Sequence, residues 1–453
     1  MVHISLTLIN QIWTTGNIPS TWKQALVIPI PKPGKGQTSP SSYRPISLTS
    51  TLCKIMETMI VNRLSIHLQQ YNLLSETQCG FQNRRSTIDQ LIRLDASVKL
   101  AFNSKRRSRR HVVAVFLDLK KAFDLVWTKG LITQFNNYGI TGRLYVWLEH
   151  FLIGRTFQVK FDHSTSDHYP LHNGTPQGSV ISPTHFNIMV NNLKTYLPKQ
   201  IDLSQFADDS CIWLICNPRR RLNLKLLQKG LDAVSKWADS WGFKISPTKT
   251  KAVLFTPKKI KFPPPPPKLY LQTQLITFTT RARFLGMLFD HNLTWKPHIT
   301  ELTQRCQADL KLLTILSNTS WGADQKTLLL IYRSLIRSKL DYACQLFQSA
   351  TSHTLKPLDT IQRKALLICT GLLPNTPIEE LLIIAGERPL HIRRTESMLK
   401  YNARIHTHLP HNLARQAMAL CQKKFFPKLT PKHKYRTNYT SITTIKSSHT
   451  TNT

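Results

Sequence analysis

The chain has 453 residues, of which 41% are hydrophobic, so it is long enough for two or three domains with apolar cores and is not a disordered polymer. Its formal charge of +37 indicates a polyanionic partner, and the aromatic content favours nucleic acid over an anionic membrane surface. No apolar run reaches the roughly 20 residues of a transmembrane helix, and residues 1–12 lack the basic segment of a secretory signal. We therefore expect an intracellular protein without a membrane partner.

The N-terminal part begins with an expected helix, followed by a strand over Trp22–Pro31 and a basic turn, Lys32–Gly36. Tyr43–Thr49 then leads into a long amphipathic helix over Leu52–Leu68, where the apolar residues recur at helical spacing. The eight cysteines along the chain form no C-x-x-C pair and have no histidines at zinc-ligand spacing, so we expect buried free thiols.

A short β-branched run, Val112–Leu117, has the composition of a buried strand and ends abruptly at Asp118. The basic run Lys105–Arg110 precedes it; a solvated loop and a phosphate contact both explain such a run. A helical stretch, a strand over Phe157–Phe161, a turn at Gly174–Ser179 and an apolar helix over Pro183–Leu193 are expected next.

Two adjacent carboxylates, Asp208 and Asp209, follow Phe206-Ala207 and precede the apolar run Cys211–Ile215. Adjacent carboxylates repel each other, and a turn between two strands can direct both at one cation. Together with Asp118 on a neighbouring strand end, they can hold two Mg²⁺ ions about 3.5–4 Å apart, the arrangement used in phosphoryl transfer. The pattern therefore predicts a two-metal site.

The remaining elements are two strands, Ala252–Phe255 and Leu269–Leu271, and three helices, Ile299–Leu316, Gln325–Phe347 and Leu355–Cys369. The polyproline run Pro263–Pro267 is expected to join the two strands and, with less support, to be an SH3-type ligand. No acidic residue follows Glu396, and Leu429–Thr453 is predicted to be a disordered basic tail. Strands mixed with helices favour an α+β fold with a ferredoxin-like sheet.

Three motifs, in this order and spacing, resemble the palm of reverse transcriptases of non-LTR, LINE-type retrotransposons, closest to the jockey-like group. They are Leu117-Asp118-Leu119-Lys120-Lys121-Ala122-Phe123-Asp124, Gly174-Thr175-Pro176-Gln177-Gly178-Ser179 and Phe206-Ala207-Asp208-Asp209. The resemblance extends from about Trp22 to about Leu399. It implies a right-hand polymerase with an N-terminal extension and fingers (1–110), a palm together with part of the fingers (111–297), a helical thumb and connection (298–400) and a basic, partly disordered tail (401–453).

The same resemblance implies a role for each of several side chains. Asp118, Asp208 and Asp209 hold two Mg²⁺ ions, with Mn²⁺ as an alternative, and Lys249 protonates the leaving pyrophosphate. Ser246 stands where the family usually has Asn, which affects the positioning of this lysine. The residues implied in nucleotide binding are Lys32, Arg44, Phe123, Gln177 and Gly178.

Phe123 is expected to exclude a 2′-hydroxyl by a steric clash, although simple core packing also explains an Ala-Phe pair. Asp124 is open between a helix cap and a catalytic role. Phe284, Leu285 and Gly286 resemble the primer grip, and an ordinary hairpin is the plain alternative.

These features predict an RNA-directed DNA polymerase whose partners are an RNA template, a DNA primer or target DNA, and dNTPs, located in nucleus and cytoplasm as a ribonucleoprotein. The sequence shows neither an endonuclease motif nor an RNase H constellation, which suggests a truncated copy. Two alternatives are a decayed or domesticated product that binds RNA without polymerising, and a group II intron maturase; the Leu-Thr-Trp motif at 293–295 favours the LINE-type reading.

Overall fold

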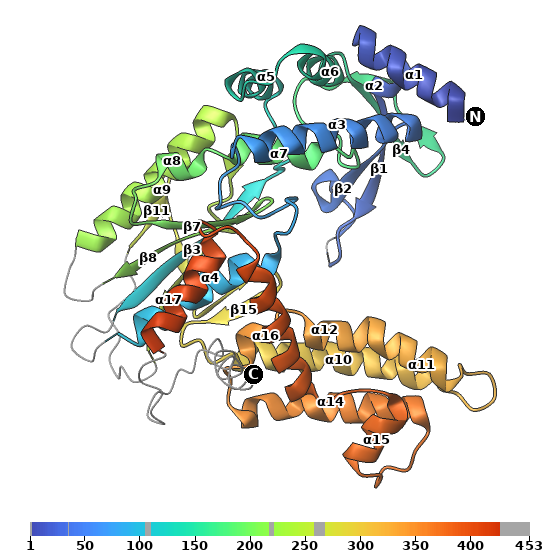
Figure 1. Ribbon diagram of the computed structural model, residues 1–453, viewed down its shortest axis with the longest axis vertical. Coiled ribbons are helices and arrows are strands. Elements are labelled where there is room, and N and C mark those ends of the chain that lie inside the picture. Colours follow the sequence, from blue (N-terminus) through green and yellow to red (C-terminus); the bar gives the residue numbers. More distant parts are fainter. Residues whose placement is uncertain (1, 35, 105–109, 217–221, 258–267, 426–453) are drawn as a thin grey trace, which may run out of the picture.

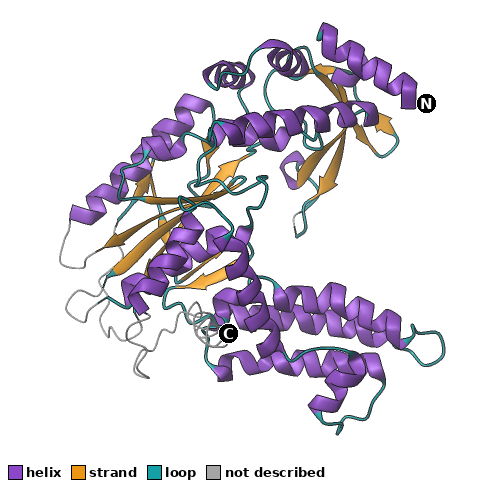
Figure 2. Ribbon diagram, viewed as in Figure 1, coloured by secondary structure: helices purple, strands orange, loops and turns teal. Residues whose placement is uncertain are grey.

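The computed structural model describes residues 2–34, 36–104, 110–216, 222–257 and 268–425. Figures 1 and 2 show a mixed helix and strand architecture in three parts: a small sheet with helices at the top, a central sheet at the left and a group of helices below. The α+β prediction is confirmed. The basic run at 105–109, the polyproline run and the tail at 429–453 lie outside the described residues.

The first part, here called the fingers, is built on a five-stranded sheet in which β1 pairs antiparallel with β2 and parallel with β4. The long helix α3 follows β2 and buries Cys53, Met56, Ile60, Leu64 and Leu68 in an apolar core, as the helical spacing predicts. Its elements are α1 (Val2–Thr15), α2 (Ser20–Lys23), β1 (Gln24–Pro31), a 3₁₀ turn (Pro40–Ser42), β2 (Tyr43–Leu48), α3 (Thr51–Gln70), β4 (Thr156–Phe161), β5 (Ser164–Thr165) and β6 (Tyr169–Pro170).

The second part, the palm, has a central sheet whose strand order is β13-β10-β3-β8-β7. Within this sheet β10, β3, β8 and β7 pair antiparallel with one another, whereas β13 pairs parallel with β10. In chain order the four antiparallel strands are β3, β7, β8 and β10, so their order across the sheet is fourth, first, third, second, which is the ferredoxin-like arrangement. The strands are β3 (His111–Lys120), β7 (Asp202–Phe206), β8 (Asp209–Cys216), β9 (Lys244–Ile245), β10 (Lys251–Phe255) and β13 (Thr277–Phe278).

Helices pack on both faces of the palm sheet. Val112, Ala114 and Phe116 of β3 enter one apolar core, and Val113, Val115 and Leu117 enter the other. Successive strand residues point to opposite faces, so burial on both sides requires the unbroken apolar run seen in the sequence. Helices α4 (Thr87–Phe102) and α9 (Leu222–Trp241) contact the sheet strands directly. The helices between β3 and β7 in the chain are α5 (Thr128–Asn137), α6 (Gly142–Leu152), α7 (Ser182–Val190) and α8 (Leu193–Tyr196).

The third part, the thumb, follows two short hairpins, β11 (Tyr270–Leu271) with β12 (Gln274–Leu275) and β14 (Arg281–Phe284) with β15 (Met287–Asp290). The predicted helix over 325–347 is wrong as a single element. A π-helical segment, Tyr332–Arg337, interrupts it, and Ala343 has a left-handed φ of 49°. The thumb helices are α10 (Lys296–Leu316), α11 (Gln325–Ile331), α12 (Ser338–Asp341), α13 (Cys344–Phe347), α14 (Ser352–Thr370), α15 (Ile378–Ala385) and α16 (Leu390–His406), and α17 (Leu413–Phe425) follows them in the chain.

Two boundaries in the structure differ from those expected from the sequence. Helix α4, placed in the fingers by the 1–110 boundary, packs against β3, β7 and β8 of the palm. Helix α17, placed in the tail by the 401 boundary, packs on α4 and buries Ala414 and Met418 (Figure 1). The reason is that one face of the palm sheet needs an apolar cover, and these two helices supply it. We therefore propose that 87–102 and 413–425 belong to the palm.

Two further observations concern the cysteines and the character of the helices. The seven cysteines whose side chains the structure describes are free and buried, as expected. None of the helices in the described ranges has the length and apolar character needed to cross a membrane.

Candidate active site

Three carboxylates meet at one end of the palm sheet because of strand register. Asp118 of β3 lies directly opposite Asp209 of β8 in the antiparallel ladder. Strands β7 and β8 are joined by the two-residue turn Ala207-Asp208, closed by the pair Phe206 and Asp209. The apolar runs on either side thus bury the strands and leave their acidic ends exposed together, as the sequence predicts.

Burial and, after it, mutual repulsion raise the pKa values of Asp208 and Asp209. Burial, then the charges of Asp208 and Asp118, raise the pKa of Asp209 to about 6. Burial and Asp118 also raise the pKa of Asp208, against the opposing effects of a backbone hydrogen bond and of Arg44. Both side chains remain exposed at the surface, so solvent and cations reach them. A cluster of this kind is stabilised by a bound cation.

The donor set fits a divalent ion of the Mg²⁺ type, which prefers carboxylate oxygens. Within the described residues, however, no three acidic, histidine or cysteine side chains are already close enough to hold a metal by themselves. Asp118 Oδ2 instead lies 3.3 Å from Lys249 Nζ. Mg²⁺ commonly takes part of its shell from water and substrate phosphates, so an open set of carboxylates is compatible with such a site.

Gln78, which the sequence analysis missed, fixes the turn that carries Asp208. Its side-chain amide accepts from the N–H of Ala207 (3.1 Å) and donates to the C=O of the same residue (3.2 Å). Ala207 has a φ of 55°, a conformation that costs energy for a residue with a Cβ. A Cβ on Gly80 would lie 2.3 Å from the Ala207 nitrogen, so only glycine allows this approach. The loop before α4 therefore holds the turn that carries Asp208.

Phe123 is half-buried in the turn that follows β3. Its ring stacks on Phe186 with centroids 4.9 Å apart and meets Phe81 edge-on at 6.3 Å. Both of its expected roles, a steric block and core packing, are compatible with this position, because the ring is supported from two sides while remaining partly exposed.

Asp124 is not a helix cap. Helix α5 starts at Thr128 with Trp127 at the capping position, and Asp124 instead accepts a hydrogen bond of 2.9 Å from the Gln177 amide. The cap interpretation is therefore wrong. The bond joins two of the sequence motifs and orients Gln177, whose amide is only partly exposed.

The turn at Gln177-Gly178 is tied to the fingers. The Gln177 C=O accepts from Ser47 N–H of β2 at 2.7 Å, and a Cβ on Gly178, which has a φ of 138°, would meet the Ser47 oxygen at 2.4 Å. Gly178 thus permits close backbone approach, but the partner in this structure is the fingers strand.

Glu57, a second residue that the sequence analysis did not identify, binds the backbone directly after the Gln177-Gly178 turn. Its buried carboxylate accepts from Ser179 Oγ (2.5 Å), Val180 N (2.6 Å) and Ile181 N (3.2 Å) at the start of α7. A negative charge at a helix N-terminus is favourable. Its signal in the sequence is an acid beside Met56 on the apolar face of α3.

Of the two basic residues expected near the triphosphate, Arg44 is exposed on β2 and its charge acts on Asp208. Lys32 is also on the fingers, with its ammonium bound to the Ser41 C=O at 2.9 Å. The charge of Arg44 thus acts on Asp208 from the fingers, whereas the ammonium of Lys32 binds the turn before β2.

The segment expected to be the primer grip is the β14–β15 hairpin. Phe284 is buried against Phe116, and Leu285-Gly286 form the turn, with φ values of 45° and 79°. Tyr342 of the thumb donates from its hydroxyl to the Leu285 C=O at 2.8 Å. A primer contact here would involve the turn backbone and not the Phe284 ring.

Comparisons with known proteins agree with this geometry. Residues 30–289 match the family described as "Reverse transcriptase (RNA-dependent DNA polymerase)". The chain is 30% identical to the probable RNA-directed DNA polymerase from transposon BS of Drosophila melanogaster, over 80% of this chain and 40% of that protein. It is 29% identical to the probable RNA-directed DNA polymerase from transposon X-element of the same organism, over 93% of this chain and 45% of that protein. It is 30% identical to the RNA-directed DNA polymerase from mobile element jockey (90% and 44%). The chain thus spans less than half the length of each relative.

The effect of substituting Asp209 on the free energy of unfolding is expected to depend on pH. Because the pKa of Asp209 is raised above the unfolded value near 4, ionisation destabilises the fold as pH rises from about 4 through about 6. Without divalent ions, Asp209→Asn should stabilise by about 1 kcal/mol at pH 8, after allowance for solvent screening, and by nothing at pH 4. Denaturant midpoints at the two pH values measure this. An equal effect of the substitution at both would contradict the electrostatic interpretation.

Loss of the Gln78 amide is expected to weaken divalent-ion binding. Gln78→Met keeps the volume but frees the Ala207 turn, so the Mn²⁺ concentration that half-saturates the thermal stabilisation should rise about 10–100-fold. Gln78→Glu retains the acceptor for the Ala207 N–H and should lie in between.

Thr77→Val is the matched control, because Thr77 bonds Gln205 and not the turn. If Gln78→Met and Thr77→Val bind Mn²⁺ as the unmodified chain does, Gln78 does not position the carboxylates.

Proposed function

Because the chain belongs to the reverse transcriptase family, we propose that it is an RNA-directed DNA polymerase of a jockey-like non-LTR retrotransposon. The observation that carries this proposal is the meeting of Asp118, Asp208 and Asp209 on adjacent strands of a ferredoxin-like sheet within the matched region. Its substrates are an RNA template, the 3′-hydroxyl of a DNA primer or target DNA, and dNTPs. The proposed location is nucleus and cytoplasm, as a ribonucleoprotein.

The three carboxylates are proposed to hold two Mg²⁺ ions, with Mn²⁺ as a substitute. When bound, such ions lower the pKa of the attacking 3′-hydroxyl and neutralise charge on the phosphates. Asp118 and Asp209 face each other across the β3–β8 ladder, and Asp208 projects from the adjoining turn, so the set is fixed by backbone geometry.

Basic side chains on two elements are proposed to handle the triphosphate. Arg44 on the fingers lies where its charge reaches Asp208, so it can bind phosphate oxygens beside the carboxylates. Lys249 follows β9, with its ammonium 3.3 Å from Asp118, and is proposed to give its proton to the departing pyrophosphate. Lys32 is proposed as a further phosphate contact; binding would require its ammonium to leave the Ser41 carbonyl.

Phe123 and Gln177 are proposed to contact the nucleotide itself. The support of Phe123 by Phe186 and Phe81 keeps its ring in place, so that a 2′-hydroxyl would meet a rigid wall. The bond from Gln177 to Asp124 fixes the amide beside it. The Leu285-Gly286 turn is proposed as the primer grip.

A product that binds RNA without polymerising is the alternative. It is disfavoured because each side chain that the resemblance requires for metal binding is present and the carboxylates lie together. Extension of oligo(dT) on poly(rA) with Mg²⁺ tests the choice: dNTP incorporation supports the polymerase, and RNA binding without any incorporation supports the alternative.

Removing one carboxylate is expected to abolish extension. Asp118→Asn and Asp208→Asn should each reduce the rate at least about 10³-fold, since each removes a metal ligand. RNA affinity, measured by filter binding, should change less than about twofold because the basic surface is retained.

Asp162→Asn is the matched control, since Asp162 is an exposed carboxylate in the turn between β4 and β5. Near-normal extension by either site variant would contradict the assignment of these residues.

Shortening Phe123 is expected to admit ribonucleotides. Phe123→Ala and Phe123→Val should lower the ratio of dNTP to rNTP incorporation by about tenfold or more, because the clash with the 2′-hydroxyl disappears. Phe123→Tyr keeps the ring and should keep the ratio. An unchanged ratio in the alanine variant would assign Phe123 to core packing alone.

A further inference from the structure

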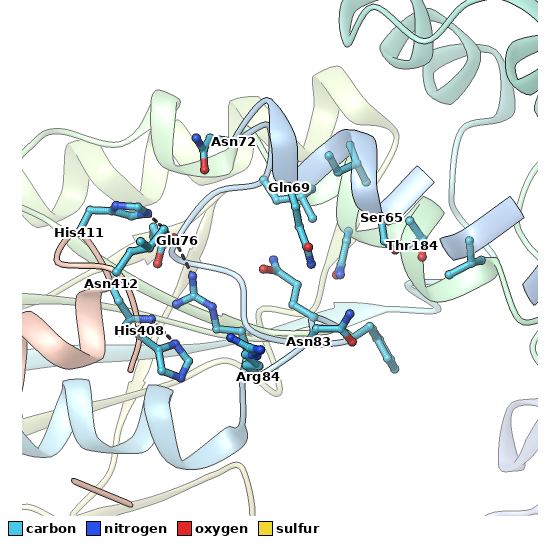
Figure 3. A pocket seen from close by; sticks show the side chains of 18 of the residues that line it. Ser65, Gln69, Asn72, Glu76, Asn83, Arg84, Thr184, His408, His411 and Asn412 are labelled. Carbon is cyan, nitrogen blue, oxygen red and sulfur yellow. Dashed lines mark hydrogen bonds and ion pairs between the residues drawn. The ribbon is translucent and has the colours of Figure 1, made fainter. Parts of the chain in front are cut away.

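The loop before α4 (residues 71–86), which holds the turn that carries Asp208, is itself held by residues from the C-terminal part of the chain. Figure 3 shows one such contact, in which His411, between α16 and α17, lies 3.4 Å from the Glu76 carboxylate. A second contact, directly after the loop, involves Tyr342 of the thumb, which lies at the break between α12 and α13. This tyrosine also reaches the hairpin expected to be the primer grip.

The Tyr342 hydroxyl lies between two segments of the chain. It donates to the Leu285 C=O at 2.8 Å, and its oxygen is 3.1 Å from Oγ1 of Thr87, the first residue of α4. A hydroxyl has one proton and a carbonyl can only accept, so the Tyr342 proton goes to Leu285 and Thr87 is the donor in the second bond. One hydroxyl therefore joins the β14–β15 turn to the start of the helix that follows the loop.

The turn that Tyr342 contacts has a strained conformation. Leu285 has a φ of 45°, which is unfavourable for a residue with a Cβ. A Cβ on Gly286 would lie 3.3 Å from Cε1 of the Tyr342 ring, so the ring and the turn are in close contact. Ala343, the neighbour of Tyr342, has a φ of 49°, so the thumb backbone also adopts an unfavourable conformation where it presents the ring.

The second carbonyl of the turn is held by a different contact. Arg283 Nη1 donates to the Gly286 C=O at 3.3 Å, and both carboxylate oxygens of Glu301 on α10 accept from Arg283 at 2.6 Å. The thumb therefore binds the turn through both of its carbonyls. The Arg283 link joins the hairpin to the thumb, whereas the Tyr342 hydroxyl extends this connection to α4.

We propose that Tyr342 is a positioning residue, whose hydroxyl fixes the Leu285-Gly286 turn relative to the loop before α4 and thereby the primer terminus relative to the three carboxylates. The effect on the primer rests on the proposed function, and the effect on the turn does not. Primer and metal ligands are held by separate segments, the hairpin and the Ala207-Asp208 turn. A misplacement of about 1 Å between reacting groups can slow a reaction about 100-fold, so a bond that ties the two supports together affects the chemical step.

Hydrogen–deuterium exchange in the free chain tests the effect on the turn. Tyr342→Phe removes one hydroxyl, so the hairpin at 281–290 should exchange about fivefold faster, the effect of one hydrogen bond of typical strength. Tyr270→Phe is the matched control, because Tyr270 is similarly exposed (43% against 40%) and its hydroxyl bonds no other described residue. Unchanged exchange of the hairpin in Tyr342→Phe would overturn the proposal.

Single-turnover extension of a primer-template tests the effect on the primer. In Tyr342→Phe the rate at saturating dNTP should fall about 10–100-fold, while the dNTP concentration that gives half the maximal rate and the fraction of active chains stay within about twofold. A merely structural role would lower the active fraction instead. Thr87→Val should slow the reaction less, and the double variant should be no slower than Tyr342→Phe, because both substitutions remove the same link.

Equal rates in Tyr342→Phe and Tyr270→Phe, or additive effects of the Thr87 and Tyr342 substitutions, would contradict the proposed positioning role. If the unmodified chain extends no primer, the proposed function is contradicted. The exchange measurement needs no catalysis, so it still decides whether Tyr342 fixes the turn.

Discussion

The site depends on one constraint, the antiparallel register between β3 and β8 that sets Asp118 opposite Asp209. A shift by one residue would send Asp118 to the other face of the sheet and break the cluster. The register is fixed because both faces of β3 are buried, with alternate residues in two separate cores. The packing of the palm therefore determines the geometry of the carboxylates. Because it holds these like charges close together, their repulsion lowers the free energy of unfolding.

The loop before α4 adds a second constraint. It presents Gln78 and Gly80 to the Ala207 turn. Its far end is anchored by Arg404 of α16, which donates to Ser86 Oγ (2.9 Å) and to the buried Asp89 carboxylate (2.7 Å). Helix α16 of the thumb thus holds the loop that in turn holds the Ala207-Asp208 turn, and this links residues more than 300 positions apart.

The sequence predicted the elements whose pattern is local: the strand ending at Asp118, the hairpin carrying Asp208 and Asp209, and the long helix of the fingers. It did not predict Gln78, because a carboxamide in a loop has no pattern until its partner, the Ala207 backbone, is placed beside it. Glu57 had a signal, an acid on an apolar helix face, but its partners lie 122–124 residues away. Helix α17 was assigned to a tail because its basic composition hid a short apolar face that only the palm makes use of.

The central claim is that the three carboxylates hold divalent ions completed by the triphosphate, and counting bound Mn²⁺ tests it most directly. Electron paramagnetic resonance would compare the chain with a chain-terminated primer-template, with and without the matching dNTP. The account predicts two Mn²⁺ ions per chain with the dNTP, fewer without it, and loss of both in Asp118→Asn/Asp208→Asn. The same count in the chain with the dNTP and in this double variant would contradict it.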